Sequence, residues 1–207
     1  MINYDASETS DIFLPHHETC FSNSLNLLAT VDASKACESE TAYRRPYRGA
    51  VGKCTAIWNA THRSSKASDA VKAIITPGAT RWDSHFDAIK RILEIGPKLG
   101  DVCQATGRPK FKLAEIECLE EYVTVMQPVA VVLDKLQGQN DTFFGQALPT
   151  LYTVKVKLSG MLLKPLKYTE PLVTSLLQGL DTTFGKKLSL TCAVTNKIAA
   201  AISHPVF

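Results

Sequence analysis

An arginine and a tryptophan stand side by side at the start of a long predicted helix. The segment reads Thr-Arg-Trp-Asp-Ser-His-Phe over residues 80–86, and Asp83 or Ser84 can cap the helix that follows. Exposed ahead of a helix N-terminus, Arg81 would hold a phosphate and Trp82 would stack on a base. The alternative is structural: Trp82 covers a hydrophobic core and Arg81 extends beside it toward solvent. The residue types leave both interpretations open.

A dense basic stretch precedes this pair. Residues 44–72 contain seven lysines and arginines against one acid, whereas residues 1–42 contain seven acids against one lysine. In a helix, we expect Arg44, Arg48 and Lys53 to lie roughly along one face, which would give a track for phosphates. A solvated helix face is the alternative. Because no base-reading helix is evident, we expect any binding to be driven mainly by charge. The candidate nucleic-acid-binding residues are Arg44, Arg45, Arg48, Lys53, Arg81 and Trp82.

Motifs of the common enzyme families are missing from the sequence. It has no G-x-G-x-x-G, G-x-x-x-x-G-K-[ST], H-E-x-x-H or G-x-S-x-G. The five histidines, His85 among them, are in settings that look exposed, and none has ligand spacing from another. The six cysteines form no C-x-x-C pair and are expected to be reduced and mostly buried. Glu120 and Glu121 are expected on the solvated side of a helix. We therefore predict no metal and no cofactor.

The bulk composition is that of an ordinary globular protein. Of 207 residues, 45% are hydrophobic and 21% are charged, which fits one substantial domain or a domain with an appendage. The net charge of +3 is too small to specify a partner. Residues 1–10 lack a basic, apolar leader, and no run approaches the roughly 18–20 apolar residues of a membrane span. These features predict an intracellular protein without a membrane partner.

Apolar residues recur at helical spacing through most of the chain, and convincing strand alternation is absent. A helix from residue 84 should be disturbed at Pro97 and end before Pro109, and the next, from Ile116 to Leu133, should bend at Pro128. Further helices are expected over residues 22–37, 47–62, 143–163, 171–187 and 190–203. A turn capped by Ser64 or Ser65 is expected to run through Ala70 to Ile75. The chain is predicted to be mainly α.

Five short motifs follow one another along the chain. They are Cys20–Leu27, Lys53–Asn59, Thr80–Ser84, Glu121–Pro128 and Ile202–Phe207. Their order resembles the middle portion of hAT-superfamily transposases and of the host proteins derived from them, and the resemblance runs from about residue 14 to the C-terminus. It implies a poorly ordered lead-in over residues 1–19, a helical remnant of an RNase H-like α/β domain over residues 20–80, and an all-helical, bundle-like insertion domain over residues 81–207.

The same resemblance implies that the chain is not an enzyme. hAT transposases cut DNA with two aspartates and one glutamate that hold two divalent metal ions. In the family both aspartates precede the Cys20 segment, but Asp5 and Asp11 lack the expected T-D-N context, and the glutamate would follow Phe207. Asn23 replaces a histidine of the family motif. In the family the tryptophan of the T-R-W motif lies near the active site and can stack on a flipped base, a role that Trp82 would inherit.

The expected function is that of a truncated, catalytically inactive, transposase-like nuclear protein with weak, sequence-independent DNA binding. One alternative is a helical protein-interaction module that dimerises or scaffolds chromatin proteins. Another is a gene fragment without a selected function. In that case the first 80 residues would be poorly folded, with rapid amide exchange there and protection from about residue 84 onward. The partners considered are therefore DNA, a second copy or another protein, and not a membrane or a small-molecule substrate.

Overall fold

The structure is a computed structural model that describes residues 20–63, 82–137 and 144–189. Helices make up nearly all of these residues, and no strand occurs among them. The prediction of a mainly α protein is therefore confirmed. None of the described helices is both long and apolar enough to cross a membrane.

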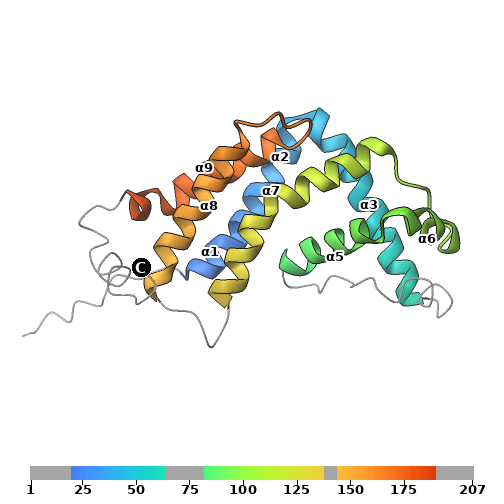
Figure 1. Cartoon of the computed structure of the whole chain (residues 1–207), viewed down its shortest axis with the longest axis horizontal. Coiled ribbons are helices and arrows are strands. Elements are labelled where there is room, and N and C mark those ends of the chain that lie inside the picture. Colours follow the sequence, from blue (N-terminus) through green and yellow to red (C-terminus); the bar gives the residue numbers. More distant parts are fainter. Residues whose placement is uncertain (1–19, 64–81, 138–143, 190–207) are drawn as a thin grey trace, which may run out of the picture.

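Helix α7 (Leu113–Gln137) runs through the middle of the molecule (Figure 1). Towards one end it packs against α3 (Thr41–Arg63) and α5 (Trp82–Ile95), and towards the other against α8 (Ala147–Met161). Most of the apolar stripe predicted for α7 is buried: Leu119, Met126, Ala130 and Leu133 are inside the core, and Ile116 is partly buried against it. The helix continues through Pro128, as predicted, and changes direction near its middle.

The first described segment is one continuous helical rod that includes a wider turn. It consists of α1 (Phe21–Leu27), a π-helical turn (Leu28–Asp32) and α2 (Ala33–Ser39). The predicted helix over residues 22–37 is confirmed, and its predicted apolar side, Leu25, Leu28 and Ala29, is buried. The rod packs against α7 and against α9 (Glu170–Leu188).

Helix α3 begins at Thr41, earlier than the predicted start at residue 47. Pro46 therefore lies inside the helix, where it removes one backbone donor. A row of aromatic contacts offsets this loss. Tyr43 is buried and stacks on Tyr47 with ring centroids 5.1 Å apart, and Tyr47 meets Tyr122 of α7 at the same centroid distance.

Helix α5 is followed by a short irregular stretch. A 3-10 turn (Gly96–Lys98) separates it from α6 (Leu99–Ala105), which confirms the predicted disturbance at Pro97. The start of α5 differs from the prediction, because Asp83 and Ser84 lie inside the helix and neither is its N-cap residue.

The C-terminal part of the described chain forms a helix pair. A 3-10 turn (Phe144–Gln146) leads into α8, and α8 packs against α9. The predicted helices over residues 143–163 and 171–187 are thus confirmed, with ends that differ by a few residues. The predicted lead-in over residues 1–19, the turn that runs to Ile75 and the helix over residues 190–203 lie outside the described residues.

The connection between α8 and α9 is held by Glu121 of α7. Its carboxylate accepts hydrogen bonds from the backbone N–H groups of Lys167, Tyr168 and Thr169 at 2.9–3.0 Å, and from the Thr169 hydroxyl at 3.0 Å. Burial raises the pKa of Glu121, but these bonds outweigh it and leave the pKa below its usual value. The prediction that Glu121 lies on a merely solvated face is wrong, because it binds the residues that enter α9.

The two sides of the predicted domain boundary share one hydrophobic core. Leu25 and Ile57 belong to the same buried cluster as Met126, Leu176 and Phe184. The boundary itself, at residue 80, lies outside the described residues and stays a prediction.

Candidate nucleic-acid interface

The Arg-Trp pair is the least described part of the predicted site. Arg81 lies outside the described residues. Helix α5 begins at Trp82, whose side chain is not among the described ones. The hypothesis that this pair holds a phosphate and stacks on a base therefore stays a prediction.

Three of the predicted residues lie together on the first half of α3. Arg45 and Arg48 are exposed, and Arg44 is half-buried with its guanidinium 3.4 Å from the Thr41 hydroxyl. At about 100° per residue, Arg44, Arg45 and Arg48 occupy an arc of about 100° on the helix surface. These guanidinium groups can reach a common phosphate backbone.

Lys53 lies on a different side of the helix, contrary to the prediction. Nine residues of helix turn it about 180° away from Arg44. Its amine donates to Glu115 Oε2 at 2.6 Å and to the Lys110 carbonyl at 2.9 Å, and it lies 5.7 Å from the centroid of the Phe111 ring. The Lys53 and Glu115 side chains are only 16% and 9% exposed. Lys53 is therefore an internal anchor and not a contact for phosphate.

This anchor brings the loop before α7 against α3. Glu115 Oε2 also accepts the backbone N–H of Lys112 at 2.7 Å, so one carboxylate binds both the helix and the loop. Gly49 permits the close approach, because a Cβ there would lie 2.8 Å from Glu115 Oε1. Glu115 is itself buried, and it is the acid that closes the loop onto α3.

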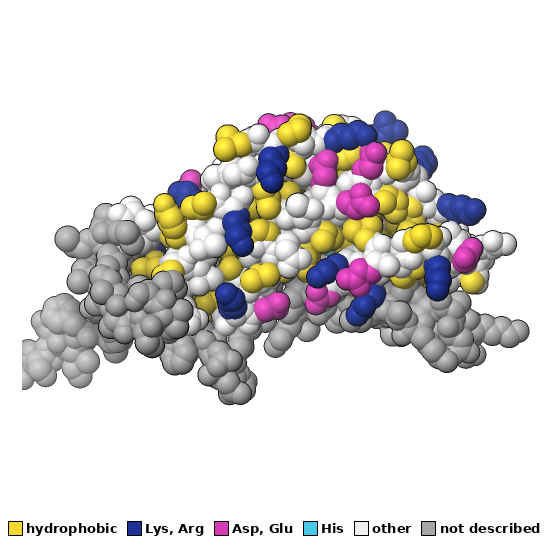
Figure 2. All heavy atoms as spheres, in the orientation of Figure 1, with side chains coloured by type: hydrophobic (Ala, Val, Ile, Leu, Met, Phe, Trp, Pro, Cys, Tyr) yellow, Lys and Arg dark blue, Asp and Glu magenta, His cyan; other side chains and the backbone are white. Residues whose placement is uncertain are grey.

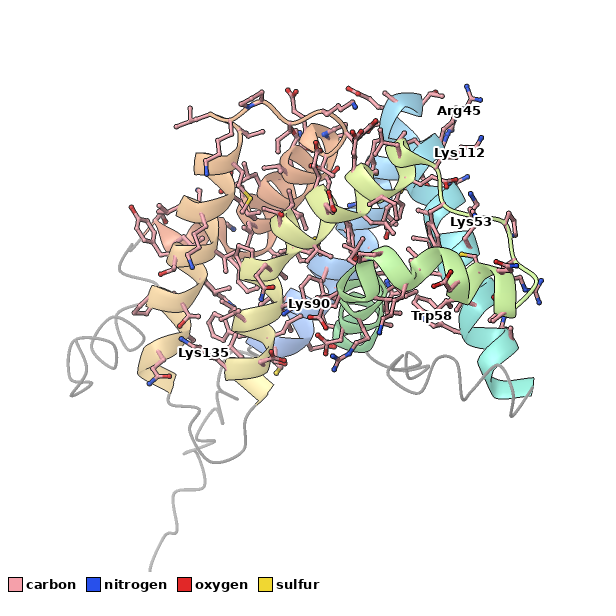
Figure 3. All side chains as sticks on the ribbon, turned by 45° about the vertical axis from the view of Figure 1, so that its right-hand side comes forward. Arg45, Lys53, Trp58, Lys90, Lys112 and Lys135 are labelled. Carbon is pink, nitrogen blue, oxygen red and sulfur yellow. The ribbon has the colours of Figure 1, made fainter. Side chains whose placement is uncertain are left out.

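The loop supplies basic residues that the sequence analysis did not select. Arg108, Lys110 and Lys112 are exposed. Figure 3 shows Lys112 near Arg45, both pointing outward, with Lys53 further along α3, while Lys90 and Lys135 lie elsewhere. Lysine and arginine side chains also gather toward this end in the space-filling view (Figure 2). We call the set the basic edge: Arg44, Arg45, Arg48, Arg108, Lys110 and Lys112.

The sequence contains a weak indication that this loop could bind nucleic acid. The run Arg-Pro-Lys-Phe-Lys over residues 108–112 places an aromatic among basic residues, a composition common in nucleic-acid-binding loops. The hydrogen bond from Lys53 to the Lys110 carbonyl shows that this run adjoins α3. The two segments are more than 50 positions apart in the chain.

Trp58 and His85 form an internal aromatic contact between α3 and α5. Trp58 is buried, and its ring meets the His85 ring edge-on at 5.8 Å (Figure 3). His85 is half-buried, so the prediction that it is exposed is wrong. Burial lowers the pKa of His85, which favours the neutral ring at pH 7. This pair stabilises the packing of the two helices.

The five thiols of the described residues fit the prediction of mostly buried cysteines. Cys37, Cys54, Cys103 and Cys118 are free and buried, whereas Cys20 is free and exposed. Burial raises the pKa of both Cys54 and Cys118 to about 12, so these thiols stay protonated and unreactive at neutral pH. Within residues 20–63, 82–137 and 144–189, no three His, Cys, Asp or Glu side chains converge into a group that could hold a metal ion.

No protein-family model matches this chain, and comparisons with curated proteins and with solved structures give no match either. The resemblance to hAT transposases rests on the five sequence motifs and stays a prediction.

Proposed function

We propose that this chain is a transposase-derived, non-catalytic protein that binds DNA weakly and without sequence preference through the basic edge. The observation that supports this proposal most directly is the Lys53–Glu115 ion pair at 2.6 Å, which holds the loop over residues 106–112 against α3. Because of it, Lys112 lies near Arg45, and both side chains point outward (Figure 3). Exposed positive charge from two segments gives a longer track for phosphates than either segment alone.

The size of this charge cluster supports weak binding. Each phosphate that is neutralised on duplex DNA releases counterions and contributes about −0.9 to the slope of log K against log salt. With four to six contacts we expect a slope of about −4 to −5 and dissociation constants of about 10⁻⁴ to 10⁻⁶ M near physiological salt. Contacts to phosphates carry no sequence information, which supports sequence-independent binding by this edge.

The proposal also includes an origin of this chain in the hAT transposase family. The motif order supports an origin of residues 20–80 in an RNase H-like domain and of residues 81–207 in the helical insertion. A nuclear location follows from the same proposal.

A salt titration tests the binding. Fluorescence anisotropy of a labelled 20-base-pair duplex is measured between about 20 and 300 mM KCl for the wild type and for Arg45→Gln/Arg48→Gln. We expect the double variant to bind more weakly, with the salt slope reduced by about 2, because two phosphate contacts are lost. A flat salt response of the wild type would exclude charge-driven binding.

The matched control removes two positive charges away from the basic edge. Lys157→Gln/Lys164→Gln changes exposed lysines of α8 and of the segment after it. We expect this variant to keep the wild-type slope. If both double variants weaken binding equally, net charge alone binds DNA and the basic edge has no special role.

The protein-interaction alternative is favoured by the outer surface of α8. Tyr152 and Val156 are 59% and 53% exposed on α8, and Leu163 just beyond it is 89% exposed. Large exposed apolar side chains in one region are typical of association surfaces. Static light scattering over a range of concentrations tests this. An increase of mass with concentration that Tyr152→Asn/Val156→Thr abolishes would support association through α8, and a monomer at all concentrations would exclude it.

A further inference from the structure

A pocket of about 300 Å³ opens beside the basic edge, where α6 and the loop that follows it meet α7. Leu99, Phe111 and Ile116 give it apolar walls, and Lys110 and Glu120 add a charge of each sign. Lys110 is also a member of the basic edge, so the pocket and the charged track are continuous. Its volume is at the lower end of the range for small-molecule sites, which suits one planar ring system.

The pocket combines the groups that a nucleobase needs. Phe111 is half-buried, and its ring is held in place by the Lys53 amine 5.7 Å from its centroid. An aromatic ring of this kind can stack on any base, because every base has a π face. The Glu120 carboxylate is exposed and can accept only, and every base carries at least one N–H on its Watson–Crick edge. In a duplex those N–H groups are paired, so only an unpaired base fits this chemistry.

We propose that this pocket receives one unstacked base of a single-stranded nucleic acid whose phosphates follow the basic edge. The inference rests on the proposed function and narrows its ligand from DNA in general to single strands. Phe111 stacks on the base, Glu120 accepts its N–H groups, and Lys110 pairs with the adjoining phosphate. No base-specific donor is needed, so binding stays independent of sequence.

Gly100 allows the pocket to be filled without a change of charge. It lines the pocket from within α6, and a Cβ at this position would meet nothing within 4 Å. Gly100→Leu should therefore fold, since replacement of a helical glycine is favourable where space is free. Gly160→Leu is the matched control, because Gly160 is also helical and open but lies in α8.

The experiment measures anisotropy with a labelled 20-nucleotide strand and with the duplex of the same sequence at one salt concentration. The wild type should bind the single strand more tightly than the duplex. Gly100→Leu should lower single-strand affinity by at least about fivefold, the lower bound for one aromatic–base stack, and leave duplex affinity unchanged. Gly160→Leu should change neither affinity.

A second variant separates the pocket from charge effects. Glu120→Ala removes a negative charge beside the phosphate track, so electrostatics alone would strengthen binding to both ligands. A base acceptor at Glu120 predicts the opposite for the single strand: weaker binding. Salt-dependent duplex binding with no single-strand preference, or with no effect of Gly100→Leu, would overturn the pocket and leave the basic edge intact. Absence of binding to either ligand would overturn both proposals.

Discussion

Lys53 and Glu115 show how a partner decides the role of a charged side chain. Both lie in segments that look solvated in the sequence, yet their side chains are nearly buried and only 2.6 Å apart. Taking two charges out of water costs several kcal/mol per ion, which their mutual attraction and the hydrogen bonds to Lys110 and Lys112 offset. The loss of one partner would leave the other charge buried and unpaired.

We therefore expect Lys53→Met to lower the free energy of unfolding by about 3 kcal/mol, the low end for breaking a buried pair. Urea denaturation followed by circular dichroism measures this. Arg91→Gln is the control: it breaks the exposed pair between Arg91 and Glu94 and should cost less than about 1 kcal/mol. Lys53→Met/Glu115→Leu should recover part of the loss. If Lys53→Met and Arg91→Gln lowered the free energy of unfolding equally, this would contradict the proposal that Lys53 anchors the loop.

Helix α9 meets the π-helical turn through a single glycine. A Cβ at Gly179 would lie 2.6 Å from Asp32 Oδ2 and would also overlap the Leu28 side chain. The close approach lets Leu28, Leu176 and Leu180 share the buried cluster. Glycine is required at this crossing for space and not for an unusual backbone angle.

Gly179→Ala should destabilise the protein by about 1–3 kcal/mol, because the two helices must separate or shift a side chain. Gly185→Ala is the control in the same helix, since a Cβ there would meet nothing within 4 Å. It should stabilise the helix by about 0.5–1 kcal/mol. Thermal unfolding of both variants measures the effect, and a shift of the same sign in both would show that the α9 crossing is not tight.

The sequence was sufficient to predict that the helices exist, but it did not predict where they begin and end. The apolar spacing of α7 is set by local sequence, and its stripe is buried as expected. The start of α3 depends on Tyr43 and Tyr47 packing with Tyr122, some 80 positions away, so local propensity around Pro46 misplaces it. The same long-range dependence hides the roles of Glu121 and Lys53.

At the scale of the molecule, the helices of residues 20–63 and those of residues 82–189 contribute to one core. Leu28 and Ile57 are as fully buried as Met126. A segment that supplies core residues unfolds together with its neighbours and not before them. The shared core thus argues against an N-terminal part that is unfolded by itself.

Hydrogen exchange followed by mass spectrometry provides the measurement. We expect peptides from α1, α2 and α3 to be protected to within about tenfold of peptides from α7, which serves as the internal reference. Rapid exchange throughout residues 20–63, with protection only from α5 onward, would contradict the shared core. That outcome would instead favour a gene fragment without a selected function.

The sequence by itself determined the mainly helical class, the apolar faces of α1 and α7, and the presence of concentrated positive charge. These properties depend on local periodicity and composition, and both can be obtained from the amino-acid sequence alone. Only the tertiary structure decided which charges stay on the surface: it buried Lys53 against Glu115, brought Lys110 against α3 and placed Lys112 near Arg45. The reason is physical, because the free energy of a charge depends on its partner and its exposure to water, and both are set by residues far along the chain.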